Sequence, residues 1–441
     1  MKRILPWLVV SMLVLIVAIT QAQESLQRTL ARTEDPVVVK AEGIAAMQGR
    51  AVSALGVLRW TEGKFEPIPA QVDERTTAGE FCFEHGPKAG KFVGNGSFDG
   101  DDELVFMAAD AGDQAPAEAA MPAGAEKAVE LLIRDPVSGG QAWAYLMAFA
   151  GEPPRSSVDY VSHETKEGRN WVLAENYQFA ELDGAAYFDR LMLRGQDGRI
   201  SGNLADQIKG RTNIKAMGGL VSTRIMDRNT NSDLTAWKDG PVRVLHRMEG
   251  YFKGGPLKIG GTGGANNVFY RNFFYTPITI ELPFKPSSVF SDFSMYYVID
   301  WNPATEGFRY FDSVNTAGVI LNGKMEPEEK NLDFKSPRTY WALTGPQGSM
   351  LVRMTSPEKW ANVVTLRLYY VDDDSVKDDP DNFPGQRQTG YFVDGIYNLD
   401  KGKYLYILYY HAPTGPLDPE LAQPILDILD HPLQVQASAW K

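Results

Sequence analysis

Five oxygen-bearing side chains that could bind calcium lie close together in the sequence. They fall at alternate positions over nine residues: Asn95, Ser97, Asp99, Asp101 and Glu103. Gly100 follows the third of them, where a calcium-binding loop needs a sharp turn. The twelfth position counted from the first is Phe106, however, where such a loop carries a bidentate glutamate. The pattern leaves two interpretations open, a calcium site and a solvated acidic turn that leads into a strand.

A second group could abstract a proton beside a sugar carboxylate. Its members are two histidines, two arginines and a tyrosine: His246, Arg243, Tyr270, Arg271 and His411. In this chemistry a histidine or tyrosine takes the proton while an arginine neutralises the acid. Strand alternation would place His246 and Arg243 on opposite faces of one strand. The alternative is that these histidines are hydrogen-bonded structural residues.

Aromatic side chains could hold sugars by stacking on their rings. The candidates lie in the C-terminal half: Trp301, Tyr310, Trp341, Tyr369, Tyr370, Tyr391 and Tyr409. Because aromatic residues favour strands and bury large areas, we expect most of them in the core.

A second acidic run follows Tyr369. It holds six aspartates: Asp372, Asp373, Asp374, Asp378, Asp379 and Asp381. Since the run follows an apolar strand and ends in Pro384 and Gly385, it indicates a loop. Such a loop either wraps a cation or forms a solvated hairpin tip.

The pattern that must position these groups is typical of β structure. Short apolar or alternating runs are separated by Gly, Pro, Asn and Asp from about Val37 onward. We predict an all-β fold with a small antiparallel β-sandwich over residues 37–150 and a larger β-sandwich over 158–436, with few short helices. The paired prolines of residues 151–157 mark the boundary, residues 23–36 form an N-terminal linker, and residues 419–429 form a helix.

The N-terminus predicts export. Lys2 and Arg3 precede an apolar run, and small residues up to Ala22 offer a cleavage site, which is typical of a secretory signal peptide over residues 1–22. We therefore expect a periplasmic or secreted protein without a retained membrane span. Loss of both cations would move the net charge from −12 to −14, which disfavours nucleic acid as a partner. Acidic polysaccharides could bind only at a locally basic groove.

Two cofactor classes are not expected. The single cysteine, Cys82, provides no Cys-x-x-Cys-His for attached haem. The glycine cluster at residues 254–264 lacks the Gly-Lys-Ser/Thr of a phosphate-binding loop, so no nucleotide is expected. Calcium is the cofactor that the sequence suggests.

Two motifs carry a family resemblance. PIPAQVDER, from Pro67, is followed after a glycine-rich connection by FDGDDELVFMAAD, from Phe98. The pair resembles the opening module of secreted bacterial β-rich proteins of unknown function, some of which are similar to a domain found beside pectin- and ulvan-degrading enzymes. Weaker echoes lie at residues 237–244 and 278–284. The resemblance implies a module and supplies no catalytic residues.

Three functions remain open. The first is an exported β protein that recognises a carbohydrate or cell-surface polymer, with calcium steadying the loop at residues 95–103. The second is a polysaccharide lyase or hydrolase with a cleft in the large domain, which requires His246 or His411 beside an arginine and a tyrosine. The third is a structural or accessory subunit with an envelope protein as its partner, which requires an exposed apolar patch.

Overall fold

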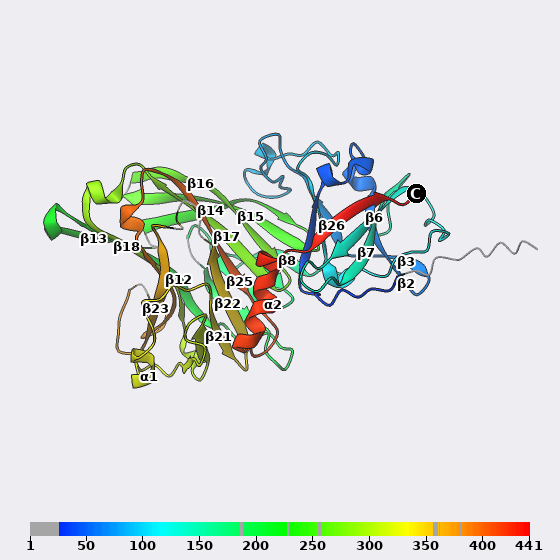
Figure 1. Cartoon of the computed structure of the whole chain (residues 1–441). Coiled ribbons are helices and arrows are strands. Elements are labelled where there is room, and N and C mark those ends of the chain that lie inside the picture. Colours follow the sequence, from blue (N-terminus) through cyan, green and yellow to red (C-terminus); the bar gives the residue numbers. More distant parts are fainter. Residues whose placement is uncertain are drawn as a thin grey trace, which may run out of the picture.

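The computed structural model describes residues 26–185, 188–226, 229–254, 257–355, 360, 362–379 and 381–441. The predicted signal peptide lies outside the described residues. Five antiparallel sheets make up the fold, which confirms the all-β prediction. The strands form two lobes, with the larger lobe on the left of Figure 1. Across the described residues, no helix is long and apolar enough to cross a membrane.

The smaller lobe consists of two sheets that share one apolar core. Alternating apolar residues such as Leu104 and Phe106 face Val129, Leu131 and Leu146 of the opposite sheet. The three-stranded sheet has the order β1 (Pro36–Lys40), β5 (Glu103–Met107) and β4 (Ala70–Asp73). The five-stranded sheet has the order β26 (Gln434–Ala439), β6 (Ala125–Arg134), β7 (Gln141–Phe149), β2 (Leu55–Thr61) and β3 (Lys64–Pro67).

The larger lobe contains a nine-stranded sheet. Its order is β14 (Thr230–Asp239), β15 (Arg243–Gly254), β16 (Leu257–Tyr270), β17 (Phe273–Leu282), β25 (Gly402–His411), β22 (Gly348–Thr355), β21 (Trp341–Gly345), β19 (Arg309–Asp312) and β20 (Val319–Ile320). Residues 257–264 of the glycine cluster therefore lie within strand β16.

Two further sheets complete the larger lobe. The first, which we call the site sheet, has the order β13 (Val221–Ile225), β12 (Ala205–Ala216), β18 (Phe290–Trp301), β24 (Gln386–Asp394) and β23 (Thr365–Asp373). The second has the order β11 (Phe188–Leu193), β10 (Tyr177–Leu182), β9 (Arg169–Ala174) and β8 (Val161–Lys166).

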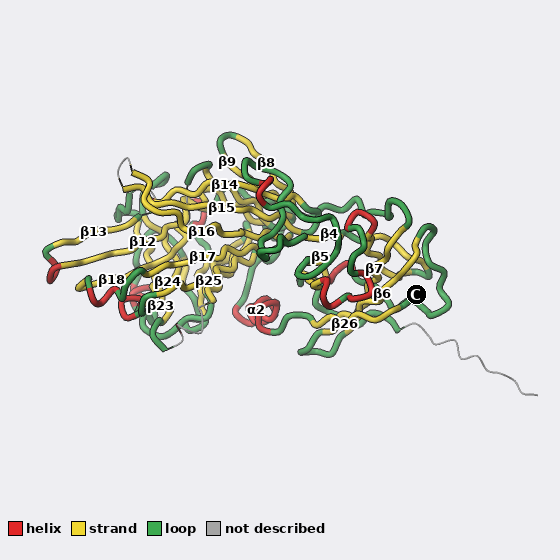
Figure 2. The backbone as a smooth tube through the Cα atoms, turned by 90° about the horizontal axis from the view of Figure 1, so that it is seen from above, coloured by secondary structure: helices red, strands yellow, loops and turns green. Residues whose placement is uncertain are grey.

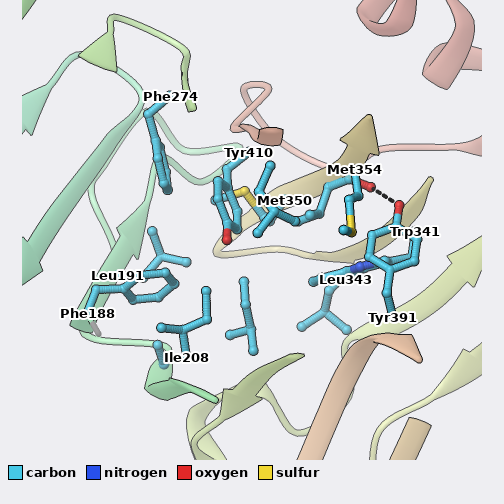
Figure 3. Close-up of a cluster of buried hydrophobic side chains, with 14 of the residues drawn as sticks. Phe188, Leu191, Ile208, Phe274, Trp341, Leu343, Met350, Met354, Tyr391 and Tyr410 are labelled. Carbon is cyan, nitrogen blue, oxygen red and sulfur yellow. Dashed lines mark hydrogen bonds between the residues drawn. The ribbon is translucent and has the colours of Figure 1, made fainter. Parts of the chain in front are cut away.

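One apolar cluster joins the sheets of the larger lobe. Figure 3 shows side chains from several sheets gathered in it, among them Ile208 of β12, Phe274 of β17, Tyr391 of β24 and Tyr410 of β25. The aromatic residues considered for sugar stacking are mostly here: Trp301, Tyr310, Trp341, Tyr370 and Tyr391 are buried. Only Tyr369 and Tyr409 of that group are half-buried.

Both ends of the described chain pack in the smaller lobe, which differs from the predicted domain boundaries. Strand β26 pairs with β6 and so belongs to the smaller lobe, although residues up to 436 were assigned to the larger one. Figures 1 and 2 both show β26 beside β6 and β7. Leu30, in the predicted linker, is buried in the core of the same lobe. Residues 151–157, predicted as the boundary, contain no helix or strand.

The helices are short, as expected. The predicted C-terminal helix forms as a 3-10 turn (Pro419–Leu421) followed by α2 (Ala422–Asp430), and α1 covers Pro327–Lys330. The apolar face of α2 packs its Leu426 against Leu351 and Phe311 of the nine-stranded sheet.

Candidate functional site

The two faces of the site sheet differ. Its inner face contributes apolar side chains to the core, and its outer face carries polar and aromatic side chains. Ile208 and Ile299 point inward, so their neighbours on each strand point outward. One outward row crosses four strands: Arg211, Tyr296, Phe392 and Arg367. Phe392 and Arg367 are half-buried, so this row reaches solvent. The face thus places aromatic rings beside guanidinium groups.

A glycine shapes the next row of this face. Tyr369 of β23 lies opposite Gly390 of β24, where a Cβ atom would come within 2.2 Å of the Tyr297 carbonyl oxygen. Because no side chain rises from Gly390, the Tyr369 ring can lean across β24 and stack on Tyr296. The two ring centroids lie 4.2 Å apart with the planes 14° from parallel. Tyr369 is half-buried and presents part of this pair to solvent.

Three cations lie on the same face, and we call them the cationic floor: Lys209, Arg211 and Arg224. The side chains of Lys209 and Arg211 are 0% exposed, and that of Arg224 on the edge strand β13 is 38% exposed. Buried charges at this density require counter-charges within the fold.

The second acidic run provides those counter-charges. Residues 374–385, which we call the acidic strap, join β23 to β24 and reach back over β18 to β12. Asp378 places its Oδ1 2.7 Å from Arg224 and its Oδ2 3.6 Å from Arg211. Asp381 lies 2.5 Å from the Lys209 ammonium. The run is thus the connection of the β23–β24 hairpin, with residues 374–377 exposed and Asp378 and Asp381 paired with cations of the same chain, and binding of a metal ion there stays a prediction.

A cluster of three carboxylates surrounds Lys209. Oxygens of Asp206, Asp300 and Asp381 lie within 4.8 Å of one another, the spacing of a possible metal site among the described residues. The Lys209 ammonium lies 2.5 Å from both Asp300 and Asp381 and so already supplies positive charge there. Burial alone would lower the pKa of Lys209, but these carboxylates hold it above its ordinary value. Burial also raises the pKa of Asp300 to about 6, against the effect of Lys209.

The residues predicted to bind calcium have separate partners. Glu103 lies 2.5 Å from both Arg75 and Arg243 at the contact between the lobes. Asp101 pairs with Lys40 at 3.0 Å. Asn95 donates to Asp99 at 3.0 Å, and its own Oδ1 accepts from the backbone N–H of Ser97 at 2.8 Å. The structure therefore does not gather the five around one point, and calcium binding there stays a prediction.

The proposed catalytic arginine is part of a buried ion cluster. Arg243 donates to Asp73 at 2.7 Å, to Glu103 at 2.5 Å and to the Tyr270 hydroxyl at 2.8 Å. Asp73 and Glu103 belong to β4 and β5, in the two motifs that carry the family resemblance. Arg243 belongs to the weaker echo at residues 237–244. These motifs therefore meet in space and connect the two lobes.

The proposed catalytic histidines are not beside that arginine. His246 points to the opposite face of β15, as alternation predicted, and its Nε2 lies 3.0 Å from Nδ1 of His163. His411 shares the face of Arg243, but the Phe273 ring stacks between it and Tyr270. Burial lowers the pKa of His411 to about 3. Arg271 lies in a turn and pairs with Glu175 at 3.0 Å. A lyase or hydrolase built on these five residues stays a prediction.

The floor residues were not identified from the sequence. Lys209 and Arg211 lie in strand β12, which begins at Ala205. The available signal was the alternation of Gln207, Lys209 and Arg211 with smaller or apolar residues, which is typical of a strand with one polar face.

Comparisons with known proteins give distant structural neighbours. No family model and no curated protein matches the chain. An α-mannosidase from Enterococcus faecalis V583 aligns with 95% of this chain at 10% identity and a TM-score of 0.45. A protein in glycosyl hydrolase family 38 from Enterococcus faecalis aligns with 95% at 9% identity and a TM-score of 0.42. The chain spans 46% and 47% of those proteins, and likeness at this level transfers no activity.

Proposed function

We propose that this protein binds a polysaccharide on the outer face of the site sheet. The observation that supports the proposal is the stacked pair Tyr296 and Tyr369, with the Arg224 guanidinium over the Tyr296 ring and with Phe392 and Arg367 next to Tyr296 in the same row of the face. Tyr296 is 3% exposed, so the half-buried rings of Tyr369 and Phe392 are the ones that would contact the apolar face of a sugar ring, with adjacent polar groups fixing its hydroxyls.

The location of this face also supports the proposal. Its opposite side packs into the main apolar cluster, so strands hold the aromatic side chains on a rigid support. Arg224 lies over the Tyr296 ring, with its guanidinium carbon 5.5 Å from the ring centroid. Such a contact keeps both groups in a fixed orientation before any ligand arrives.

Two alanine variants test the proposal. Tyr369→Ala and Phe392→Ala should each weaken binding of a recognised polysaccharide about tenfold, the effect of losing one stacking contact. Binding would be measured by isothermal titration calorimetry after a thermal-shift screen of acidic and neutral polysaccharides. The matched control is Tyr409→Ala, since Tyr409 is another half-buried tyrosine whose ring lies beside that of Tyr275 in the nine-stranded sheet, with the centroids 5.3 Å apart. The proposal fails if no polysaccharide binds, or if all three variants bind equally well.

One observation favours the accessory-subunit hypothesis as a second candidate. The hairpin between β12 and β13 carries exposed apolar side chains at its tip, with Met217 72%, Leu220 87% and Val221 49% exposed. A surface of this kind is typical of a contact with another protein. This hairpin extends from the left end of the larger lobe in Figure 1, away from the smaller lobe.

A further inference from the structure

An exposed apolar surface lies at the end of the larger lobe. It comprises side chains from two segments, the turn between β12 and β13 and the loop that joins β17 to β18. Phe290 pairs in register with Ala216, which places this loop beside the turn. Figures 1 and 2 both show the β12–β13 hairpin projecting at this end, away from the smaller lobe. We call the surface the apolar tip, and its members are Met217, Leu220, Val221, Phe284 and Val289, which are exposed, and Phe290, which is half-buried.

The tip projects because the strands beneath it run past the rest of the site sheet. β24 pairs with β18 over residues 295–300, so within the described chain the sheet narrows to β13, β12 and β18 before it reaches the tip. Residues 217–224 are all exposed. Since side chains alternate along a strand, both faces of β13 therefore meet solvent.

The turn itself holds an apolar side chain outward. Met217, Gly218 and Gly219 have φ angles of 52°, 66° and 92°, so three successive residues adopt positive φ. Glycine adopts this conformation without a steric penalty, whereas methionine does so at a cost in backbone energy. Conformations of this kind are typical of functional segments. A contiguous apolar surface on such a turn indicates a contact with another apolar phase or molecule.

The charges around the tip are locally positive on an acidic protein. The whole chain has a net charge of −12, whereas five cations and three acids lie in the segments around the tip, residues 213–225, 281–293 and 400–403. Lys285 pairs with Asp400 at 3.2 Å, which places the third segment beside the second. Lys215 and Lys285 are both exposed, and another anion can compete for them because exposed ion pairs contribute little. An anionic surface would attract this end of the molecule and repel the rest, which would orient the tip toward it.

We infer that the apolar tip inserts into the interfacial region of an anionic phospholipid bilayer, with Lys215 and Lys285 among the head groups. The positive charge around the tip matches anionic lipid, and this complementarity determines the choice of partner. A flat protein surface would cover one face of the projecting strands, whereas lipid surrounds an inserted hairpin and buries apolar side chains on both faces. The polar backbone groups of the turn need water or head groups as partners, so insertion ends at the interface. The inference goes beyond the proposed function and does not depend on it.

A fluorophore on the tip tests the inference in the full chain. The dye NBD, attached at Val289→Cys in a Cys82→Ser background, brightens when that position moves from water into lipid. The vesicles are pure phosphatidylcholine and an equal mixture of phosphatidylcholine and phosphatidylglycerol. We expect the tip to bind the mixed vesicles at least about tenfold more tightly, because two exposed lysines meet anionic head groups. The control probe is NBD at Val93→Cys, an exposed apolar position of the smaller lobe, which should not respond.

Two variants test the apolar and the cationic contributions separately. Leu220→Asp should weaken binding at least about tenfold, because it places a charge where lipid must lie. Its matched control is Leu421→Asp, since Leu421 is an exposed leucine outside the tip. Lys285→Gln should weaken binding to the mixed vesicles about fivefold and leave binding to phosphatidylcholine unchanged. Its matched control is Lys64→Gln, which removes an exposed lysine paired with Glu66 in the smaller lobe.

Several outcomes would overturn the inference. These are no response of the tip probe to either kind of vesicle, an equal response of the probe at residue 93, or equal affinity for both kinds of vesicle. A response that Leu220→Asp leaves unchanged would mean that the N-terminal apolar run or another surface binds the lipid. If the tip probe brightens with protein concentration and not with lipid, the tip contacts a second copy of the chain and the lipid assignment is wrong. Polysaccharide binding should be the same in Leu220→Asp as in the wild type, so none of these results bears on the proposed function.

Discussion

Replacement of Arg243 by methionine should destabilise the protein strongly. Arg243 is 2% exposed and pairs with Asp73 and Glu103, so it connects the larger lobe to the smaller one. Burial would raise the pKa of Asp73, but Arg243 and Lys238 outweigh burial and hold it below its ordinary value. Methionine keeps an apolar stem of similar length and removes the charge, which leaves both acids short of one cation.

The expected loss in the free energy of unfolding is about 3 kcal/mol. Removing one partner of a buried ion pair costs about 3–5 kcal/mol. The lower end applies because each acid keeps another cation, with Lys238 3.2 Å from Asp73 and Arg75 2.5 Å from Glu103. The matched control is Arg50→Met, which breaks an exposed pair with Glu126 at 3.3 Å and should cost about 0–1 kcal/mol.

Urea unfolding followed by tryptophan fluorescence measures both variants. A double-mutant cycle with Asp73→Asn should give a coupling energy of about 1–3 kcal/mol, since the two groups are in direct contact. The argument is refuted if Arg243→Met loses no more stability than Arg50→Met, or if the coupling energy is near zero. Either result would mean that the apolar residues between the lobes, such as Val105 and Leu245, hold them together without the ions.

Two further predictions concern pH. Burial raises the pKa of Glu181 from 4.5 to about 7, so its contribution to stability is present below pH 4.5 and is lost as pH rises to 7. Glu181→Gln should therefore be up to about 3 kcal/mol more stable than the wild type at pH 8, as urea unfolding across pH would show. A gain that is the same at pH 4 and pH 8 would contradict this. Burial lowers the pKa of His163 from 6.5 to about 4, so stability present above pH 6.5 is lost as pH falls to 4. In His163→Asn the midpoint of thermal unfolding should therefore fall less steeply between pH 6.5 and pH 4 than it does in the wild type. The same pH dependence in both proteins would refute the attribution to His163.

Local patterns predicted the strands and their faces. The apolar run after Asp102 forms β5, and alternation in β15 separates His246 from Arg243. These features depend on residues close in sequence, for which side-chain period and burial are sufficient arguments. The same arguments predicted most of the aromatic residues in the core, and Tyr391 illustrates this because its ring is fully buried.

The site depended on contacts that sequence spacing does not reveal. Lys209 and Asp381 are 172 positions apart, and their pairing requires β12 and β24 to join one sheet through β18. A single sequence does not tell which strands, far apart along the chain, become neighbours in a sheet. The acidic run was recognisable as a loop, but its cation could not be identified because the charge that it neutralises belongs to a distant strand.

The net charge of −12 and the cationic floor together define how an anion could be bound. An acidic surface repels polyanions at long range, so binding cannot rest on a general positive field. The floor is already neutralised by Asp378 and Asp381, so an incoming anion must replace a carboxylate rather than meet an open charge. These ion pairs are therefore part of the charge balance of the fold itself, and any ligand of this face has to leave them in place or replace them.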